Sequence, residues 1–515
     1  MAQPLPIETI RDARAHFAEV VDRADRDDIP TVITRRGKEV AAVVSIEVLG
    51  QVSSFGGETI TWVVVLAITF LLPYAMVFAE IGALHTDEGG PYVWVKAAFG
   101  RVAASVATIL YWVTVPVWIG GSMAFLAFET WTRFVGHLPR GGVADYLFKL
   151  VFVWITISSA IMSLKHGKWL PTVSAIAKVT LLVFFVGTTV VYAAQHGVQG
   201  IGFGDLAPST VGFLGLVPVV LYAFLGFEAG NGAGGEMRSA ARDVPVSLAR
   251  SAAVAAGCYL LPIVAILVVL PSSAITGVSG LMDAIVTVYS VYGDAADVMI
   301  TVTAVALVLV LIGQGAAWMI VGDRTQATVA ADGAFFGGFF GVFSERFGTP
   351  LRINLLTGAV ASLFLVAAMT MVEGAAGAVF KVTLSLCVST YLMAYLLMIP
   401  AAAKLRRHRP TDATSYRLPV SGRTFSLLAY VATGWVVLGS WVALFPGTLE
   451  GLLGIDYDFG EKWGVSRVAF ESFTLGTLAV LLALGILGYV RAARVRTASA
   501  PVASTPKDPD PAATG

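Results

Sequence analysis

The chain has 515 residues, of which 57% are hydrophobic and only 13% charged, against a charged share of about 25% in a typical soluble domain. Because the formal net charge is zero, no overall field favours nucleic acid or an acidic partner. The two cysteines, Cys258 and Cys387, lie in separate apolar runs and predict no disulfide or metal framework. The sequence contains no P-loop and no catalytic elbow, so we expect neither an ATP-driven pump nor an enzyme, and no cofactor or metal.

Residues 1–50 form the first predicted unit and contain no apolar run of signal-peptide or membrane length. Thr9 and Asp12 resemble a capping box, and apolar residues then recur at helical spacing. Further on, the stretch TVITRRGKEVAAVVS alternates like two strands joined at Arg36 and Gly37. The pattern predicts a small soluble α/β unit, in which one helix packs on a hairpin.

The segments ARAHFAEVVDRA and VITRRGKEVAAVVSIEVL resemble the N-terminal module of the prevent-host-death (Phd/YefM) antitoxins, whose dimers bind operator DNA and whose C-terminal tails neutralise a toxin. The resemblance implies a homodimer and a DNA or toxin partner for residues 1–50. Contact with DNA phosphates would come from four basic side chains: Arg14, Arg35, Arg36 and Lys38. The alternative is a basic turn that is merely solvated.

Eleven apolar runs that are long enough to cross a bilayer follow, so we predict an all-α, multi-pass protein of the cell membrane. The predicted spans are 60–80, 103–134, 145–163, 171–194, 211–229, 251–271, 296–321, 353–372, 376–399, 425–445 and 471–490. The tail, 496–515, is small, polar and proline-rich, and is predicted to be disordered. The membrane domain is therefore expected to occupy residues 51–495.

Basic residues gather in alternate connections between the predicted spans, most clearly in the run KLRRHR at 404–409. The positive-inside rule places those connections and the C-terminus in the cytoplasm. With eleven spans, the N-terminus then lies outside. That location conflicts with contact between residues 1–50 and DNA in the cytosol.

Aromatic residues stand out on two of the predicted spans, 103–134 and 296–321. Tyr111, Trp112 and Trp118 lie on the first span, and Trp318 lies on the second. Their bulk predicts a pocket lining or a gate. The alternative is that they face lipid or the protein core.

The span 171–194 carries a lysine, Lys178, about seven residues or roughly 10 Å from its beginning. At this depth the side chain reaches the membrane surface only with strain, and an ionisable residue in such a position is a functional candidate. The alternative is a structural lysine that is paired with nearby carbonyls.

The span 211–229 begins like a membrane helix and then continues LGFEAGNGAGG, with five glycines and an acid. A helix interrupted in mid-membrane exposes carbonyl groups whose partial negative charge suits an ammonium group. The predicted substrate-binding residues are Ala223, Phe224, Leu225, Gly226, Phe227 and Glu228. The alternatives are a glycine-rich helix end that leads into a loop, and a solvated Glu228 in the inner vestibule.

Three motifs resemble the amino acid-polyamine-organocation (APC) superfamily of permeases over about residues 55–495. They are EIGALHTDEGGPYVWVKAAFGR beginning at Glu80, the FLGFEAG break with GEMRSAARDVP behind it, and DRTQATVAADGAF. The resemblance implies the LeuT-like fold, in which two five-helix halves are related by inverted symmetry and each half begins with a broken helix. It also implies that Lys178 stands where sodium-coupled relatives bind Na⁺, and couples transport to a proton.

Four charged residues near the predicted cytoplasmic ends of the spans are candidates for salt bridges or a gate: Glu80, Asp323, Arg324 and Asp332.

The chain departs from the superfamily pattern at its start. The first apolar run, TWVVVLAITFLLPYAMVFAE, aligns with the second span of the superfamily. The superfamily's first span carries a glycine-rich motif whose amides hold the substrate carboxylate, and this motif is absent here. We therefore expect that half of the binding site is missing.

We expect a secondary active amino acid permease that works by alternating access, with proton symport or exchange. Its substrate would be an amino acid or a related amine. Whether a chain without the first span transports is left open at this point. The alternatives are an antitoxin-like, DNA-binding regulator fused to a membrane anchor, and an inert fusion product.

Overall fold

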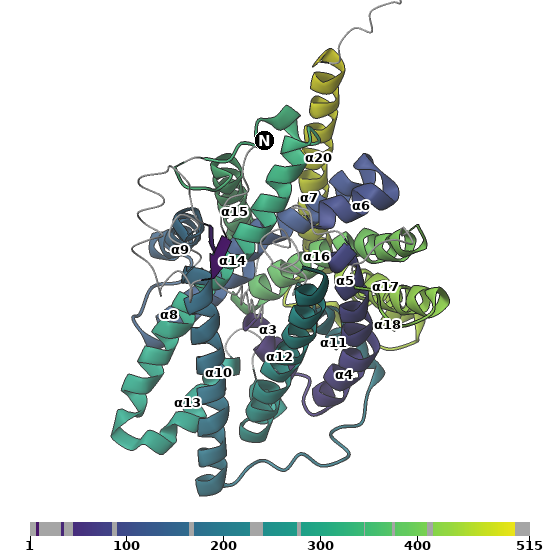
Figure 1. The fold of residues 1–515 in the computed structure, drawn as a ribbon. Helices are drawn as coiled ribbons and strands as arrows, with labels where there is room; N and C mark the ends of the chain where they lie inside the picture. The colour runs from purple at the N-terminus through teal and green to yellow at the C-terminus, as the bar shows by residue number, and fades with distance from the viewer. Residues whose placement is uncertain are drawn as a thin grey trace, which may run out of the picture.

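The computed structural model describes residues 7–9, 32–34, 45–84, 90–163, 169–226, 240–275, 280–344, 346–372, 376–408 and 416–499. Helices dominate these residues (Figure 1). The α-helices are α3 (Glu47–Ser53), α4 (Glu58–Leu66), α5 (Leu72–Leu84), α6 (Pro91–Phe99), α7 (Arg101–Trp118), α8 (Ala124–Phe134), α9 (Val143–Ser163), α10 (Trp169–His196), α11 (Thr210–Phe224), α12 (Ala240–Val269), α13 (Gly280–Tyr289), α14 (Ala296–Ala331), α15 (Leu351–Met371), α16 (Ala376–Arg407), α17 (Gly422–Leu444), α18 (Thr448–Leu452), α19 (Phe459–Trp463) and α20 (Arg467–Ser499). Short 3₁₀ or π segments join some of them: η1 (Ala67–Leu71), η2 (Ile119–Met123), η4 (Ser272–Ala274), η5 (Ser290–Ala295) and η6 (Phe336–Gly338).

Ten helical segments of the described residues are long and apolar enough to cross a membrane, and α11 is a shorter apolar helix. Together they correspond to the eleven predicted spans, which confirms an all-α, multi-pass membrane protein. One of the ten segments, Gly280–Ala331, includes a helix that the span prediction did not contain. This helix, α13, lies at the opposite end of the molecule from the end of α20 (Figure 1).

The centre and the periphery of the helix bundle differ in exposure. In α16, 83% of an apolar 18-residue stretch is buried inside the protein. Cys387 and Tyr395 on this helix have no solvent-accessible surface. The outer helices α10 and α20 leave large apolar side chains exposed, such as Val190 at 66% and Val480 at 69%. Such side chains are stable only against an apolar solvent, so these helices face lipid.

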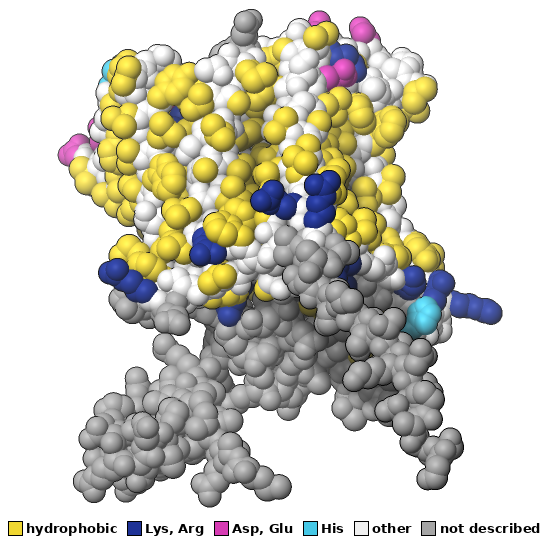
Figure 2. All heavy atoms as spheres, turned by 90° about the horizontal axis from the view of Figure 1, so that it is seen from above, with side chains coloured by type: hydrophobic (Ala, Val, Ile, Leu, Met, Phe, Trp, Pro, Cys, Tyr) yellow, Lys and Arg dark blue, Asp and Glu magenta, His cyan; other side chains and the backbone are white. Residues whose placement is uncertain are grey.

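Figure 2 shows the same separation on one face of the molecule. Hydrophobic side chains cover most of the face. Lys and Arg side chains gather toward one side of the view, and the few visible Asp and Glu side chains lie toward the opposite edges. The distribution is typical of a protein that crosses a bilayer.

The predicted span 103–134 is kinked rather than straight. α7 and α8 are joined through η2, where Gly121 has non-helical dihedral angles (φ −100°, ψ −117°). Gly120 lies against the backbone of α15, because a Cβ atom built there would be 2.9 Å from the carbonyl carbon of Ala361. The two glycines therefore permit a bend at a close helix crossing, as expected where small residues meet in a membrane.

The two described strands, β1 (Ile7–Thr9) and β2 (Val32–Thr34), pair in parallel, with Ile7 opposite Val32. β2 lies inside the first strand of the predicted hairpin. The helix, the turn and the second strand of the predicted module lie outside the described residues, so the module as a whole stays a prediction.

The segment directly before α4 belongs to the packed core of the membrane domain. Val48 and Leu49 of α3 have no accessible surface, and the helix packs against α11, α12 and α13. The backbone N–H of Ser45 donates a hydrogen bond of 2.6 Å to the Tyr259 hydroxyl on α12. The predicted module boundary at residue 50 therefore falls inside a buried membrane-domain helix.

We predict that Gly120→Ala lowers the free energy of unfolding by about 1–3 kcal/mol, the usual cost of overpacking, because the new methyl group overlaps the α15 backbone. Thermal unfolding of the purified protein in detergent measures the change. Gly434→Ala on α17 is the control, since a Cβ atom there has no neighbour within 4 Å. Equal unfolding temperatures for the two variants would contradict the close crossing.

Candidate functional site

The α11 helix stops inside the stretch where the glycine-rich sequence predicts an interruption. It begins at an N-cap, Ser209, whose hydroxyl accepts a hydrogen bond from the Gly212 N–H at 2.9 Å. It ends at Phe224, and Leu225 is extended (φ −90°, ψ 159°). The Leu225 N–H donates a hydrogen bond of 3.3 Å to the Tyr222 carbonyl, and the carbonyl groups of the last turn have no following helical turn among the described residues to accept from.

Gly226 is held in a conformation and a space that exclude larger residues. Its φ of 106° is rarely adopted by residues with a side chain. A Cβ atom at this position would be 2.6 Å from Cζ2 of Trp318 and 2.8 Å from the Tyr391 hydroxyl oxygen. Its N–H donates a hydrogen bond of 3.3 Å to the Tyr74 hydroxyl. The backbone thus turns away from the helix axis against a wall of aromatic rings.

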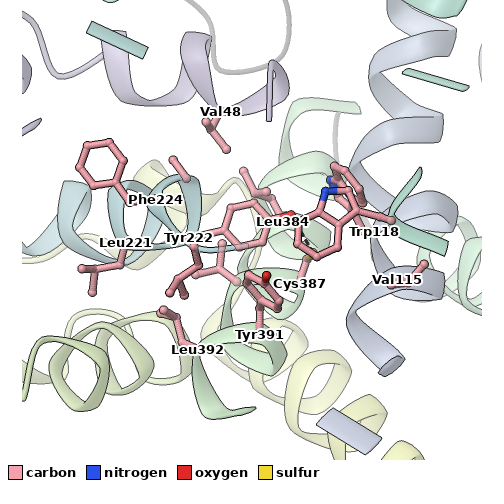
Figure 3. Close-up of a cluster of buried hydrophobic side chains, with 14 of the residues drawn as sticks. Val48, Val115, Trp118, Leu221, Tyr222, Phe224, Leu384, Cys387, Tyr391 and Leu392 are labelled. Atoms are coloured by element: carbon pink, nitrogen blue, oxygen red, sulfur yellow. Dashed lines mark hydrogen bonds between the residues drawn. The ribbon is translucent and has the colours of Figure 1, made fainter. Parts of the chain in front are cut away.

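A small cavity of about 10 Å³ adjoins the end of α11. The residues that line it come from four helices and the chain just before α3: Ser45, Tyr111, Thr114, Val115, Trp118, Tyr222, Leu225, Trp318 and Tyr391. Figure 3 shows Trp118, Tyr222 and Tyr391 around the same space, with Val48 of α3 beside them. A volume of this size holds at most one water molecule, so a substrate enters only when side chains move.

The aromatic rings of the lining form one connected cluster. The centroids of Trp318 and Tyr391 are 5.6 Å apart and their planes are at 88°. Trp118 meets Trp318 edge-on at 6.2 Å, and Tyr111 lies 5.7 Å from Tyr391. Ring faces attract cations, most strongly when the site excludes water. The cluster is therefore chemically suited to an ammonium group.

A buried carboxylate on α3 lies behind this lining. Glu47 is 2% exposed, and its Oε1 accepts a hydrogen bond of 2.6 Å from Nε1 of Trp118. Its Oε2 lies 3.5 Å from the Gln314 amide nitrogen on α14. Glu47 also interacts electrostatically with Lys178 of α10, which is likewise 2% exposed. Glu47 was not among the predicted site residues, although an acid among apolar residues just before a span was a usable signal.

The structure places the other predicted pocket residues in two different surroundings. Tyr111, Trp118 and Trp318 line the cavity. Trp112 lies outside the lining, and its Nε1 donates hydrogen bonds of 3.0 Å to Asp323 and to Thr357. Tyr222 and Tyr391 line the cavity without having been predicted, because tyrosines in an apolar span carry no distinctive pattern.

Among the predicted substrate-binding residues, Ala223, Phe224, Leu225 and Gly226 form the buried end of α11. Phe227 and Glu228 lie outside the described residues. The four basic residues that were predicted to contact DNA also lie outside them: Arg14, Arg35, Arg36 and Lys38.

Asp332, at the end of α14, joins that helix to α6 and α7. Its Oδ2 accepts hydrogen bonds of 2.7 Å from Lys96 and 3.1 Å from Arg101, and it also accepts one from the Tyr92 hydroxyl. Burial raises the pKa of the Asp332 carboxyl, but these donors and the charge of Arg101 outweigh burial and hold the pKa below its usual 3.8. The cluster is a charged latch on the side that the sequence assigns to the cytoplasm.

Glu80 makes a second ion pair, with Arg406 of α16. The same carboxylate accepts a hydrogen bond of 2.9 Å from the Leu418 N–H, and Arg406 donates to the Val420 carbonyl at 2.6 Å. This pair fixes the end of α16 and the following segment to α5.

Asp323 is fully buried and accepts hydrogen bonds from neutral side chains. Trp112 and Thr357 donate to Oδ1 at 3.0 and 2.6 Å, and Asn354 donates to Oδ2 at 2.6 Å. The neighbouring Arg324 lies on the same helix, α14. The Asp323 contacts tie α14 to α7 and α15.

The family profile described as "Amino acid permease" matches residues 40–450. The chain belongs to the amino acid permease family. It is therefore a secondary transporter in a membrane, and the expected APC-type fold is confirmed. The match begins at residue 40, ahead of α3. A second profile, "Antitoxin Phd_YefM, type II toxin-antitoxin system", matches residues 7–51 and so overlaps the permease match at α3.

Curated transporters share about a quarter of their residues with this permease. A probable agmatine/putrescine antiporter from Lactococcus lactis is 27% identical over 401 residues, which is 78% of this chain and 84% of that protein. An uncharacterised transporter from Legionella pneumophila is 26% identical over 415 residues, or 79% and 87% of the two chains. A branched-chain amino acid permease from Bacillus subtilis is 27% identical over 248 residues, or 44% and 49%.

We predict that Gly226→Ala reduces substrate uptake at least about tenfold, because strain at a positive φ costs of order 1–3 kcal/mol and the methyl group displaces Trp318 or Tyr391. Uptake by reconstituted vesicles measures the loss. Gly257→Ala on α12 is the matched control, since a Cβ atom there meets nothing within 4 Å. Wild-type uptake by Gly226→Ala would refute the steric role of this glycine.

We predict that Asp332→Asn lowers the free energy of unfolding by roughly 1 kcal/mol, as for other partly exposed ion pairs. An acid with a lowered folded pKa stabilises the protein above its unfolded pKa and loses that effect only as the pH falls through the folded value. Since the folded value lies below 3.8, the deficit stays constant between about pH 5 and pH 8. Asp456→Asn in an exposed loop is the control, and a deficit that disappears by pH 5 argues against the latch.

Proposed function

We propose that this permease carries an amino acid or a related amine by alternating access, and that the amino group binds at the carbonyl end of α11. The observation that carries the proposal is the combination of a helix that ends at Phe224, an extended Leu225 and a left-handed Gly226 beside an aromatic cavity.

The end of α11 supplies the polar groups that a charged solute needs after it leaves water. The free carbonyl oxygens at a helix C-terminus carry a partial negative charge and attract a cation. In an apolar span their attraction is not screened by water, and substrate carriers of this architecture bind ions at such half-helix ends. An ammonium group near Leu225 would accept this interaction and face the rings of Trp318 and Tyr391.

The cavity volume supports a gated mechanism. Because about 10 Å³ is far less than any amine substrate occupies, the structure corresponds to a closed arrangement of the site. The Asp332 cluster closes one side of the bundle through charged contacts, and breaking it would separate α14 from α6 and α7. Alternating access then requires this latch and the aromatic cluster to rearrange in sequence.

Lys178 is the proposed proton-coupling residue. It is buried on α10 and interacts electrostatically with Glu47, whose other contact, Trp118, lines the cavity. A change in the charge of Lys178 is thereby felt at the cavity wall. An ionisable side chain at this depth suits a role in proton movement better than a structural role.

The relatives point to the first substrates to test. The Lactococcus protein is described as acting on agmatine and putrescine, and the Bacillus protein on branched-chain amino acids. These solutes share an amino group that is protonated at neutral pH. The shared group is the one that the end of α11 is suited to bind.

Binding of DNA or a toxin by residues 1–50, and dimer formation through them, stay predictions. The antitoxin match ends at residue 51, but the segment from Ser45 onward is packed against the membrane helices. Any such binding would therefore involve residues that precede Ser45.

The experiment that tests the proposal is uptake of labelled putrescine, agmatine and leucine by vesicles that contain the full-length protein, with and without a proton gradient. We expect wild-type uptake of at least one solute to respond to the gradient. Lys178→Met should still exchange labelled for unlabelled substrate but should lose that response, and Lys462→Met, at an exposed position, should behave as wild type. No uptake of any amine contradicts the proposed function, and a gradient response in Lys178→Met contradicts the coupling role.

A further inference from the structure

The carboxylate of Glu47 is connected to the cavity through a hydrogen bond with a residue of the lining. Ser45, two residues before it, lines the cavity, and so does Trp118, whose indole N–H donates to Glu47. The α3 helix packs against α11, and Glu47 is linked to the cavity wall through the Trp118 indole. The segment before the first full span therefore contributes a polar group to a site whose other half is the end of α11.

Glu47 accepts hydrogen bonds from Trp118 and Gln314, and both donors are neutral. A single buried charge is costly, and a compensating cation reduces that cost. Lys178 provides the compensating charge, since the two groups interact electrostatically. Other titratable groups that face Glu47 and Lys178 are acids that are neutral when protonated: Cys258 and Tyr259 on α12, Tyr222 on α11 and Cys387 on α16.

The charge balance of the site favours a cation without a carboxylate. None of the described residues that line the cavity is Lys or Arg, so no lining side chain offers a positive charge to a substrate carboxylate. Glu47 is tied to the lining through Trp118, and the opposite charge of Lys178 offsets its charge. A zwitterion would bring an unpaired carboxylate into this surface, whereas an amine would bring only the charge that Glu47 attracts.

We propose that Glu47 selects a cationic amine that lacks a carboxylate, and that the substrate ammonium takes the place of Lys178 as its partner. This proposal rests on the proposed transport function. When the amine binds, Lys178 releases its proton to water on the side to which the site is open, and it regains a proton when the amine leaves. Glu47 then pairs either with protonated Lys178 or with one ammonium group of the substrate, and amine and proton move in opposite directions.

Binding of putrescine and of leucine to the purified full-length protein tests the proposal. We expect the wild type to prefer putrescine by at least about tenfold, which corresponds to 1.4 kcal/mol. Glu47→Gln should abolish the preference, and Glu47→Asp should keep part of it. Glu450→Gln removes a different buried acid, on α18, and should leave the preference unchanged.

The charge exchange makes a separate prediction for Lys178→Met. This variant leaves the Glu47 carboxylate without its cation, so putrescine should bind more tightly and its affinity should no longer vary with pH below about pH 9, where the amine itself stays protonated. In the wild type, affinity should rise with pH over the same range, because the proton competes with the amine. If the Glu47–Lys178 pair were merely structural, both Glu47→Gln and Lys178→Met would bind putrescine more weakly, and the pH profile of binding would be unchanged.

Two outcomes overturn the proposal: a wild type that prefers leucine, or Glu47→Gln protein that keeps the preference for putrescine. If Glu47→Gln does not fold, the double variant E47Q/K178M, which leaves neither charge buried, provides the same comparison. If the wild-type protein takes up leucine or putrescine but either of these results is found, only the role assigned to Glu47 is wrong. Wild-type protein that takes up neither solute overturns the transport proposal as well.

Discussion

The fold depends on one constraint, that a backbone polar group inside a bilayer must find a partner within the protein. The α11 helix meets this constraint with its own hydrogen bonds up to Phe224, where it ends. The following residue pair is surrounded by Tyr74, Trp318 and Tyr391. The aromatic groups and Gly226 hold the interruption in one conformation and keep lipid away from it. In the proposed function, carbonyl oxygens at this place bind the solute, and the local loss of regular structure would supply the binding surface.

The charged groups of the bundle fall into two sets. Glu47 and Lys178 lie behind the cavity wall and are linked to it through Trp118. Asp332 and Glu80 lie farther along the helices and join α14 to α6 and α7, and α5 to α16. Trp118 packs against Trp318, so a change of partner in the first set would reach the aromatic cluster through Trp118. In the proposed mechanism, breaking the contacts of the second set opens one side of the bundle, so the first set would serve binding and the second would serve gating.

The sequence was sufficient to predict the spans and the end of a helix within the glycine-rich stretch, because run length and clustered glycines report directly on membrane crossing and on helix ends. It was not sufficient for α3. Residues 47–53 are too few to be predicted as a membrane span. The charged Glu47 also makes the segment look exposed, although Val48 and Leu49 have no accessible surface. The kink at Gly121 and the lining by Tyr222 and Tyr391 were also missed, since helix crossings and side-chain directions depend on neighbours far along the chain. Trp112 was grouped with Tyr111 because the two are adjacent, yet successive residues point about 100° apart on a helix, and Trp112 contacts Asp323 instead.

The central claim is that main-chain carbonyls at the end of α11 receive the substrate's ammonium group. A structure of the full-length protein in a lipid environment with putrescine bound measures this directly, through the distances from the amine nitrogen to the carbonyl oxygens of Tyr222, Ala223 and Phe224. We expect at least one distance of about 2.7–3.2 Å, the range of a hydrogen bond, with the helix still ending near Phe224. Density for putrescine elsewhere, or a helix that continues through Gly226 when the amine is bound, would contradict the account.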